Sequence, residues 1–459
     1  MKKIISGKYL IFILLIILFF VQYCAFKKNG GMNNIITGGG DLYNDYEFRM
    51  KLLEKNWGFA FSDHLQDHIL AVNILKHGKF TLSVYEPYTS TLWKEPGYPS
   101  FLALLYKLKG KNFEYYFDRS KPIPAIAFNE VNVDFIGIAH IFIFILSLYM
   151  LYLFMIKYVV KTDQYKEFIS TLLVFIFYLL VRNSVQACYF NLSVYALMYF
   201  FSMLIIFLGA SAIDTVSEKK NYKYLITGLA LGLACLFTSV FKYIILIIIL
   251  INIFVFTEKK INYKKYMVSM LLLVFGFGII VTPWLVRNYV ISGKFDFANR
   301  IGYMMYGKAM AASKGYNFRA PDDLLHQELR KLAYDRSFNI TDTQLDDYFM
   351  KKAKPLIKKY YPRIILDCIY QLKHQLAYKK REIYINLIIL TAFIISIVKR
   401  NYIQIYLFLI YGYFIAVTSM TTSFLPGHSA NILYIKFICF TVGCYMIIIT
   451  MFNLRKLKI

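Results

Sequence analysis

Two carboxylates stand four residues apart in the first long polar stretch of the chain. Asp63 is followed by Gln66 three residues later, a pattern typical of a helix start, so we expect a helix over 63–76. Asp63 and Asp67 then lie one turn apart on the same face. A carboxylate in this position can accept the proton of a hydroxyl group, and a second one nearby can raise its pKa. The alternative for Asp63 is a plain N-cap.

Two histidines accompany these acids. His64 and His68 have the i, i+4 spacing that can hold a metal ion on one helix face, but no Glu follows in zincin fashion. Most of the six cysteines lie inside apolar runs and show no paired spacing, which argues against a zinc site and a disulfide framework. No metal site is assigned, and the cofactor requirement stays open.

The elements that position these residues are membrane helices. Apolar types make up 58% of the 459 residues and charged types 17%, too little polar surface for a soluble chain of this size. Runs of about 20 apolar residues must cross a bilayer as helices. We expect an all-α polytopic bundle of about ten transmembrane helices, near 9–26, 133–157, 168–184, 190–212, 222–238, 240–257, 267–286, 383–398, 402–420 and 431–453.

Charge predicts the orientation of the bundle. The net charge of +26 comes from short Lys/Arg clusters between apolar runs, so we predict no nucleic-acid partner. Lys242 interrupts the apolar stretch 222–257, which forms either one long tilted helix or two helices. All the clusters fall on the side of the N-terminus if it forms two, so we predict two. Both chain ends are therefore predicted to be cytoplasmic, in a multi-pass protein of the cell membrane.

The expected organisation has three parts. Residues 1–291 form a transmembrane unit with an outer loop at 27–132, residues 292–382 form an outer segment, and residues 383–459 form the last transmembrane helices. In the outer segment, 346–378 has helical apolar spacing, with a break expected at Pro362. Ten Lys/Arg against two acids over 351–382 favour an interfacial helix on anionic lipids. The alternative is a surface helix packed on the bundle.

Three stretches, in order, resemble the GT-C class of membrane glycosyltransferases. They are Phe61–Ala71 with its leading Asp, Trp93–Tyr106 with a Pro-Gly-Tyr-Pro segment, and Thr282–Tyr289 with Pro-Trp-Leu-Val-Arg-Asn, followed by Gly293-Lys294-Phe295. The chain is most similar to bacterial relatives of protein O-mannosyltransferases and of the lipid A aminoarabinose transferase. The resemblance implies inverting transfer of a sugar from a polyprenyl-phosphate donor to a cell-envelope glycan, lipid or protein at the extracytoplasmic face.

The resemblance also implies roles for particular residues. Asp63 stands where the family has its catalytic carboxylate, with Asp67 as a second carboxylate. The leaving lipid phosphate needs cationic or hydrogen-bonding groups, and a guanidinium forks onto phosphate oxygens. The residues expected to contact the donor phosphate are Arg287, Asn288, Lys94 and His428, and those expected to serve the acceptor or the loop are Glu95 and Tyr98.

Several residues depart from the family pattern or have simpler explanations. No acid stands at 191–195, Thr238-Ser239 replaces a Thr-Arg-Pro stretch, and Ser423–His428 keeps its Pro without an Arg. Arg287 can instead be an interfacial anchor beside Trp284, and Glu95 a solvated loop charge. The alternative functions are a lipid-linked sugar flippase or transporter, and a polysaccharide polymerase.

Overall fold

The computed structural model describes most of the chain. The described residues are 7–29, 51, 55, 63–83, 90–110, 115–118, 125–128, 133–161, 165–190, 194–215, 220–260, 262–298, 300–315, 321–335, 337–338, 340–377, 380–421 and 426–456. Inside these ranges some side chains, those of Asp63 and His428 among them, lie outside the description.

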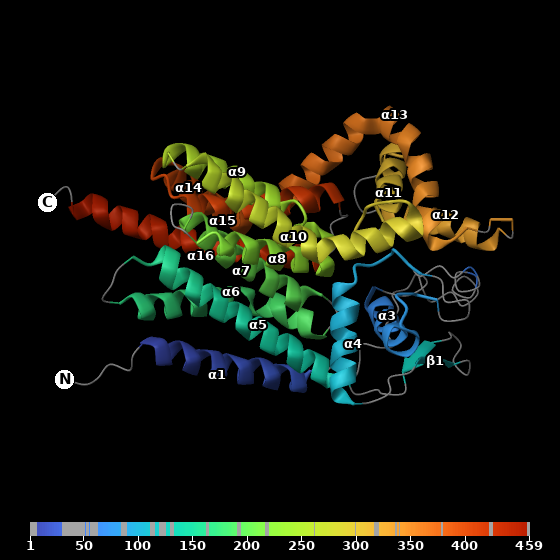
Figure 1. The fold of residues 1–459 in the computed structure, drawn as a ribbon, viewed down its shortest axis with the longest axis horizontal. Coiled ribbons are helices and arrows are strands. Elements are labelled where there is room, and N and C mark those ends of the chain that lie inside the picture. The colour runs from blue at the N-terminus through green and yellow to red at the C-terminus, as the bar shows by residue number, and fades with distance from the viewer. Residues whose placement is uncertain are drawn as a thin grey trace.

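The protein is an all-α polytopic bundle, as the sequence predicts, and each of the ten expected apolar runs coincides with a helix. These helices lie side by side along the long axis of the molecule (Figure 1). They are α1 (Gly7–Lys28), α5 (Asp134–Phe154, continued by the π-turn η3, Met155–Val159), α6 (Lys166–Phe190), α7 (Tyr195–Asp214), α8 (Tyr222–Phe237), α9 (Ile244–Glu258), α10 (Tyr263–Ser292), α14 (Lys380–Val398), α15 (Tyr402–Thr421) and α16 (Pro426–Lys456).

Eight helices of the described chain are long and apolar enough to cross a membrane. The helix α8 is shorter, with 16 residues. The chain between α8 and α9 turns at Thr238, whose backbone is extended, and continues through one 3-10 turn, η4 (Ser239–Phe241). This confirms the prediction of two helices across 222–257.

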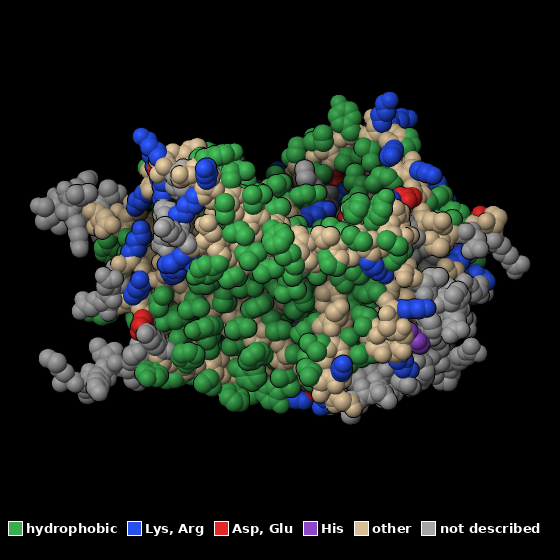
Figure 2. All heavy atoms as spheres, viewed as in Figure 1, with side chains coloured by type: hydrophobic (Ala, Val, Ile, Leu, Met, Phe, Trp, Pro, Cys, Tyr) green, Lys and Arg blue, Asp and Glu red, His purple; other side chains and the backbone are tan. Residues whose placement is uncertain are grey.

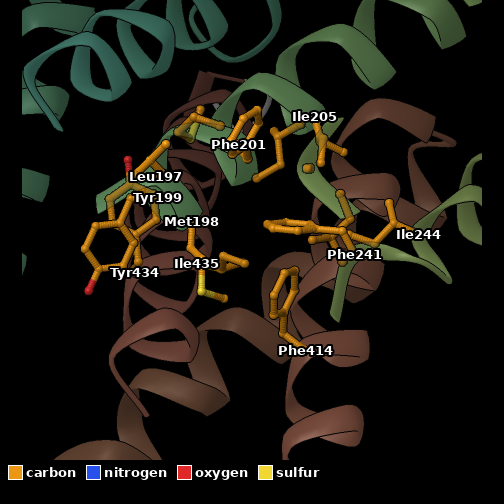
Figure 3. Packing of buried hydrophobic residues seen from close by; sticks show 14 of the residues in the cluster. Leu197, Met198, Tyr199, Phe201, Ile205, Phe241, Ile244, Phe414, Tyr434 and Ile435 are labelled. Atoms are coloured by element: carbon orange, nitrogen blue, oxygen red, sulfur yellow. The ribbon is translucent and has the colours of Figure 1, made fainter. Parts of the chain in front are cut away.

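The core of the bundle is built around α7, whose residues are buried over most of its length. Aromatic rings from α16, η4 and α15 converge on it (Figure 3). The Tyr199 and Tyr434 rings stack with centroids 4.4 Å apart, and the Phe241 and Phe414 rings meet edge to face at 5.7 Å. Such pairs add about 0.5–1.5 kcal/mol to the burial of their area. The centre of the bundle is therefore a packed core rich in aromatic side chains.

Lys and Arg side chains lie at both ends of the bundle (Figure 2), and those of one end lie in the short connections between long helices. Both chain termini lie at one end, which we call the basal end (Figure 1). Lys and Arg side chains gather there, beside a wide apolar band around the middle of the molecule (Figure 2). The basic residues of the helix connections at this end include Lys161, Lys220, Lys259, Lys260, Lys399 and Arg400. The expected clusters thus share one end with both termini.

The opposite, distal end carries the remaining elements (Figure 1). They are α3 (Asp63–His77), α4 (Gly97–Lys109), the antiparallel pair β1 (Tyr115–Asp118) and β2 (Ala125–Phe128), α11 (Ile301–Ser313), α12 (Pro321–Tyr334) and α13 (Asp342–Ala377). The helix α3 confirms the expected helix start at Asp63. The break expected in α13 lies at Tyr360, whose φ of −116° and ψ of 15° leave the helical region two residues before Pro362.

Candidate functional site

The predicted site residues meet at the distal end, where α4 lies across the ends of the long helices and α3 packs on α4 (Figure 1). The short segment Ser90–Pro96, which we call the hub, runs into α4. Side chains from α3, from the α8–α9 connection and from the end of α10 all bind to this segment.

The hub holds α3 through a buried ion pair. Lys94 Nζ lies 3.4 Å from Asp67 Oδ2, and the two residues are only 8% and 7% exposed. A buried charge requires a partner because burial strips its hydration. Asp67 therefore fixes one face of α3 against the hub, and Asp63 begins the same helix one turn earlier. The side chain of Asp63 itself lies outside the described residues.

Two tyrosines of α4 extend this buried network. The Tyr106 hydroxyl bonds His68 Nδ1 of α3, and the Tyr98 hydroxyl lies 3.2 Å from His140 Nε2 of α5. Burial, with the nearby charge of Asp67, raises the pKa of both tyrosines well above the ordinary value. They therefore stay protonated at neutral pH. The network locks α3, α4 and α5 together, so Tyr98 is part of the packed interior rather than an open loop.

Glu95 makes the second connection of the hub. Its Oε1 accepts hydrogen bonds from the backbone N–H and the hydroxyl of Ser239, at 3.1 and 2.8 Å, and its Oε2 lies 3.4 Å from an Arg300 nitrogen. Glu95 thus caps the η4 turn and is not a solvated loop charge. Sequence reasoning missed Ser239 and Arg300, because neither lies in a pattern that points to a partner over 140 residues away.

Arg287 makes the third connection. One of its nitrogens donates to the carbonyl oxygen of Thr91 at 3.0 Å and another to that of Phe80 at 3.3 Å. The guanidinium lies over the Trp284 ring, 4.5 Å from its centroid. This geometry clamps the two ends of the chain between 80 and 91. It directs Arg287 into the protein, which differs from an anchor that reaches out toward lipid head groups.

Asn288 supports the clamp. Its Oδ1 accepts a hydrogen bond from Arg287 at 2.8 Å, and its Nδ2 donates to the carbonyl oxygen of Asp296 at 2.7 Å. Asn288 also lines a small open recess with about 160 Å³ of empty space, together with Leu92, Ser292, Lys294 and Asp296. The only cation of this recess, Lys294, is paired with Asp347. The recess lies beside the hub and is too small for a sugar.

The structure thus joins five of the eight predicted residues, Asp67, Lys94, Glu95, Arg287 and Asn288, through the hub, whereas Tyr98 bonds His140 of α5. Asp63 lies at the start of α3, and His428 lies near the start of α16 with a side chain outside the description. Among the described residues, no group of three or more His, Cys, Asp or Glu is placed to hold a metal ion. In the described part of the site, Asp67 and Glu95 pair with cations, and Arg287 binds backbone carbonyl oxygens.

Comparison with known proteins returns no relative. No protein-family model, no curated protein and no solved structure matches this chain.

Proposed function

We propose that this membrane protein is a glycosyltransferase that moves a sugar from a polyprenyl-phosphate donor to a hydroxyl of a cell-envelope acceptor. In this reaction the acceptor oxygen attacks the anomeric carbon, and the bond from that carbon to the phosphate oxygen breaks. Asp63 takes the proton of the acceptor, because a hydroxyl is a weak nucleophile until a base is positioned beside it. Polyprenyl phosphate leaves.

One observation carries the proposal: the hub brings the predicted carboxylate helix and the predicted cation of α10 to one place. Asp67 and Arg287 are 220 positions apart in sequence, yet both bind the seven-residue segment Ser90–Pro96. The Cα atom of Asp63 lies about 6 Å along α3 from that of Asp67, because a helix rises about 1.5 Å per residue. The base and the cations that the resemblance assigns would then serve one reaction centre at a membrane boundary.

The geometry refines the proposed roles. Asp67 is compensated by Lys94, so we assign it to holding α3 in place rather than to a second base. The same ion pair neutralises Lys94, whereas Arg287, which binds backbone carbonyl oxygens, contributes positive potential that favours the developing phosphate charge. Asn288 keeps the guanidinium in its orientation.

The proposal places the basal end in the cytoplasm and the hub at the extracytoplasmic face. The support is that the Lys and Arg of the basal end lie in short connections between long helices, because positive charge in short loops is retained on the cytoplasmic side, whereas long translocated segments are exempt. A donor lipid that has crossed the membrane would then meet Asp63 from the outer leaflet.

A direct test uses the full chain in proteoliposomes with a polyprenyl-phosphate sugar labelled in the sugar. Membrane glycan extracts serve as acceptors, and liposomes without protein serve as the control. We expect labelled sugar in the acceptor and free polyprenyl phosphate. Movement of intact labelled lipid between the leaflets without bond cleavage would overturn the proposal in favour of a flippase.

A further inference from the structure

The last part of α13 has an unusual surface. Beyond the bend at Tyr360 it forms an arm, residues 361–377, that leads toward α14. Five large apolar side chains of the arm are between 48% and 63% exposed: Tyr361, Ile365, Leu366, Ile369 and Tyr370. Of the apolar stripe that the sequence suggests (Ile357, Tyr361, Ile364, Cys368, Leu372 and Leu376), only Tyr361 is exposed, and the others are turned partly toward the protein. The exposed stripe is therefore a second one.

The side of the arm that faces the protein is mixed, because two polar residues lie there beside Leu372 and Leu376, which pack against the core. Gln371 is 2% exposed and donates to Asp367 at 2.8 Å. One turn later, Gln375 Oε1 accepts a hydrogen bond from Ser419 of α15 at 3.2 Å. A helix that faces water on its outer side carries mainly polar residues there. The five large apolar side chains that the arm exposes are instead expected where the surrounding medium is apolar.

The arm leads into the membrane helix α14, whose first two residues, Lys380 and Arg381, are exposed. Only two residues separate the arm from α14, whose exposed side chains include Ile383, Leu387 and Leu390. Figure 1 shows α13 descending from its bend, far from the bundle axis, back to the bundle where α14 begins. The arm therefore approaches the apolar band of the bundle obliquely from the distal side.

Cations mark the other end of the arm. Lys358 and Lys359 are exposed just before the bend, and Lys373 is exposed among the apolar residues of the outer face. Lysine side chains near the end of an inserted segment reach the head groups with their ammonium groups while their stems stay in the apolar region. Anionic phosphates at this depth would complement the charge.

We infer that the arm of α13 is a lipid-binding surface that inserts obliquely into the leaflet at the distal end. Its occupant is anionic phospholipid: acyl chains cover Ile365, Leu366, Ile369 and Tyr370, and head-group phosphates contact Lys358 and Lys359. Burial of such apolar area is favourable by about 25 cal/mol per Å². The inference stands independently of the proposed transferase activity.

Tryptophan quenching tests the insertion. The variant Ile369→Trp of the full chain is reconstituted in nanodiscs whose phospholipid, rich in phosphatidylglycerol, carries brominated acyl chains. Leu390→Trp on α14 is the matched position that faces lipid, and Lys351→Trp, exposed on α13 before the bend, is the matched position outside. After subtraction of the wild-type signal, we expect Ile369→Trp to lose fluorescence as Leu390→Trp does and Lys351→Trp to lose none. Equal fluorescence of Ile369→Trp and Lys351→Trp would overturn the inference.

A second measurement needs no substitution. Unmodified protein in nanodiscs is photolabelled with a phospholipid that carries a diazirine in its acyl chain, and the labelled peptides are identified by mass spectrometry. We expect label on peptides that contain 361–373, with a higher yield in phosphatidylglycerol than in phosphatidylcholine. Label confined to the long helices would show that lipid does not cover the arm.

Discussion

At the residue scale, the Asp67–Lys94 pair is the most consequential contact that the structure adds. The two side chains are about nine-tenths buried, so removal of one charge leaves the other without compensation. We expect Asp67→Leu or Lys94→Met alone to cost about 3–5 kcal/mol and to lower the thermal unfolding temperature in detergent. The double variant should recover most of the loss, because two apolar groups need no partner. Additive losses in the double variant would rule out direct coupling.

A second prediction at this scale concerns Arg287. Its hydrogen bonds to the chain between 80 and 91 can be tested without any phosphate ligand. Arg287→Lys keeps the charge but lacks the planar fork that reaches two carbonyl oxygens. We expect faster hydrogen exchange of the Thr91 amide, which bonds Phe80 O at 3.2 Å across the clamped chain. Unchanged exchange in Arg287→Lys would show that the clamp does not hold this segment.

The sequence predicts the chemistry of these residues but not their pairing. Asp63 is recognisable as a helix start, and Arg287 as a cation at a membrane exit. The assignment of Asp67 as a second base does not anticipate Lys94, 27 positions away, as its partner. No local sequence pattern links Glu95 to its partners Ser239 and Arg300. Pairings of this kind depend on how three distant segments pack, which local patterns do not encode.

At the element scale, close helix packing depends on two glycines that face backbone. A Cβ atom added to Gly276 of α10 would lie 2.5 Å from the carbonyl oxygen of Leu225 on α8, and one added to Gly228 of α8 would lie 2.1 Å from that of Leu273. Small residues at such crossings allow two membrane helices to approach closely. The pair α8–α10 is therefore intolerant of side chains at both positions.

A matched pair of alanine variants tests this crossing. Gly276→Ala should separate α8 from α10 and lower the unfolding temperature in detergent. Gly278→Ala, on the same helix, meets nothing nearer than Thr282 Oγ1 at 4.0 Å and should leave that temperature unchanged or raise it, because alanine favours the helix by about 1 kcal/mol. Equal effects of the two variants would contradict the crossing.

The elements themselves are largely predictable from the sequence, since a continuous apolar run of membrane length has few alternatives to a helix. The face that each helix presents is less predictable. In α13 both sides of the arm carry apolar residues, so a single stripe read from spacing does not distinguish the protein-facing side from the exposed side. The burial of Gln371 and the hydrogen bond from Ser419 of α15 to Gln375 decide between them.

At the scale of the whole molecule, the even number of long helices leaves both termini at one end (Figure 1). The charge rule predicts this arrangement once 222–257 is divided into two helices, and the extended residue Thr238 provides that division. The layer of distal helices was not predictable in detail, because α11 and α12 lack the long apolar runs that identify membrane helices.

The orientation of the bundle is tested with reporter fusions in cells. Alkaline phosphatase, which is active only outside the cytoplasm, is inserted after Gly315 between α11 and α12 or fused to the C-terminus. We expect activity from the insertion and none from the C-terminal fusion, as the basic basal end requires. The reverse pattern would place the hub in the cytoplasm and remove the basis for a lipid-phosphate donor on the outer side.

The central claim concerns the carboxylate that begins α3, and the most direct measurement is sugar transfer by Asp63→Asn in proteoliposomes. Asparagine is as good an N-cap as aspartate, so helix α3 should remain while the base is lost. Asp347→Asn, at an exposed carboxylate paired with Lys294, is the matched control. We expect transfer to fall by at least about 100-fold in Asp63→Asn and to persist in Asp347→Asn. Full transfer activity in a folded Asp63→Asn protein would contradict the account.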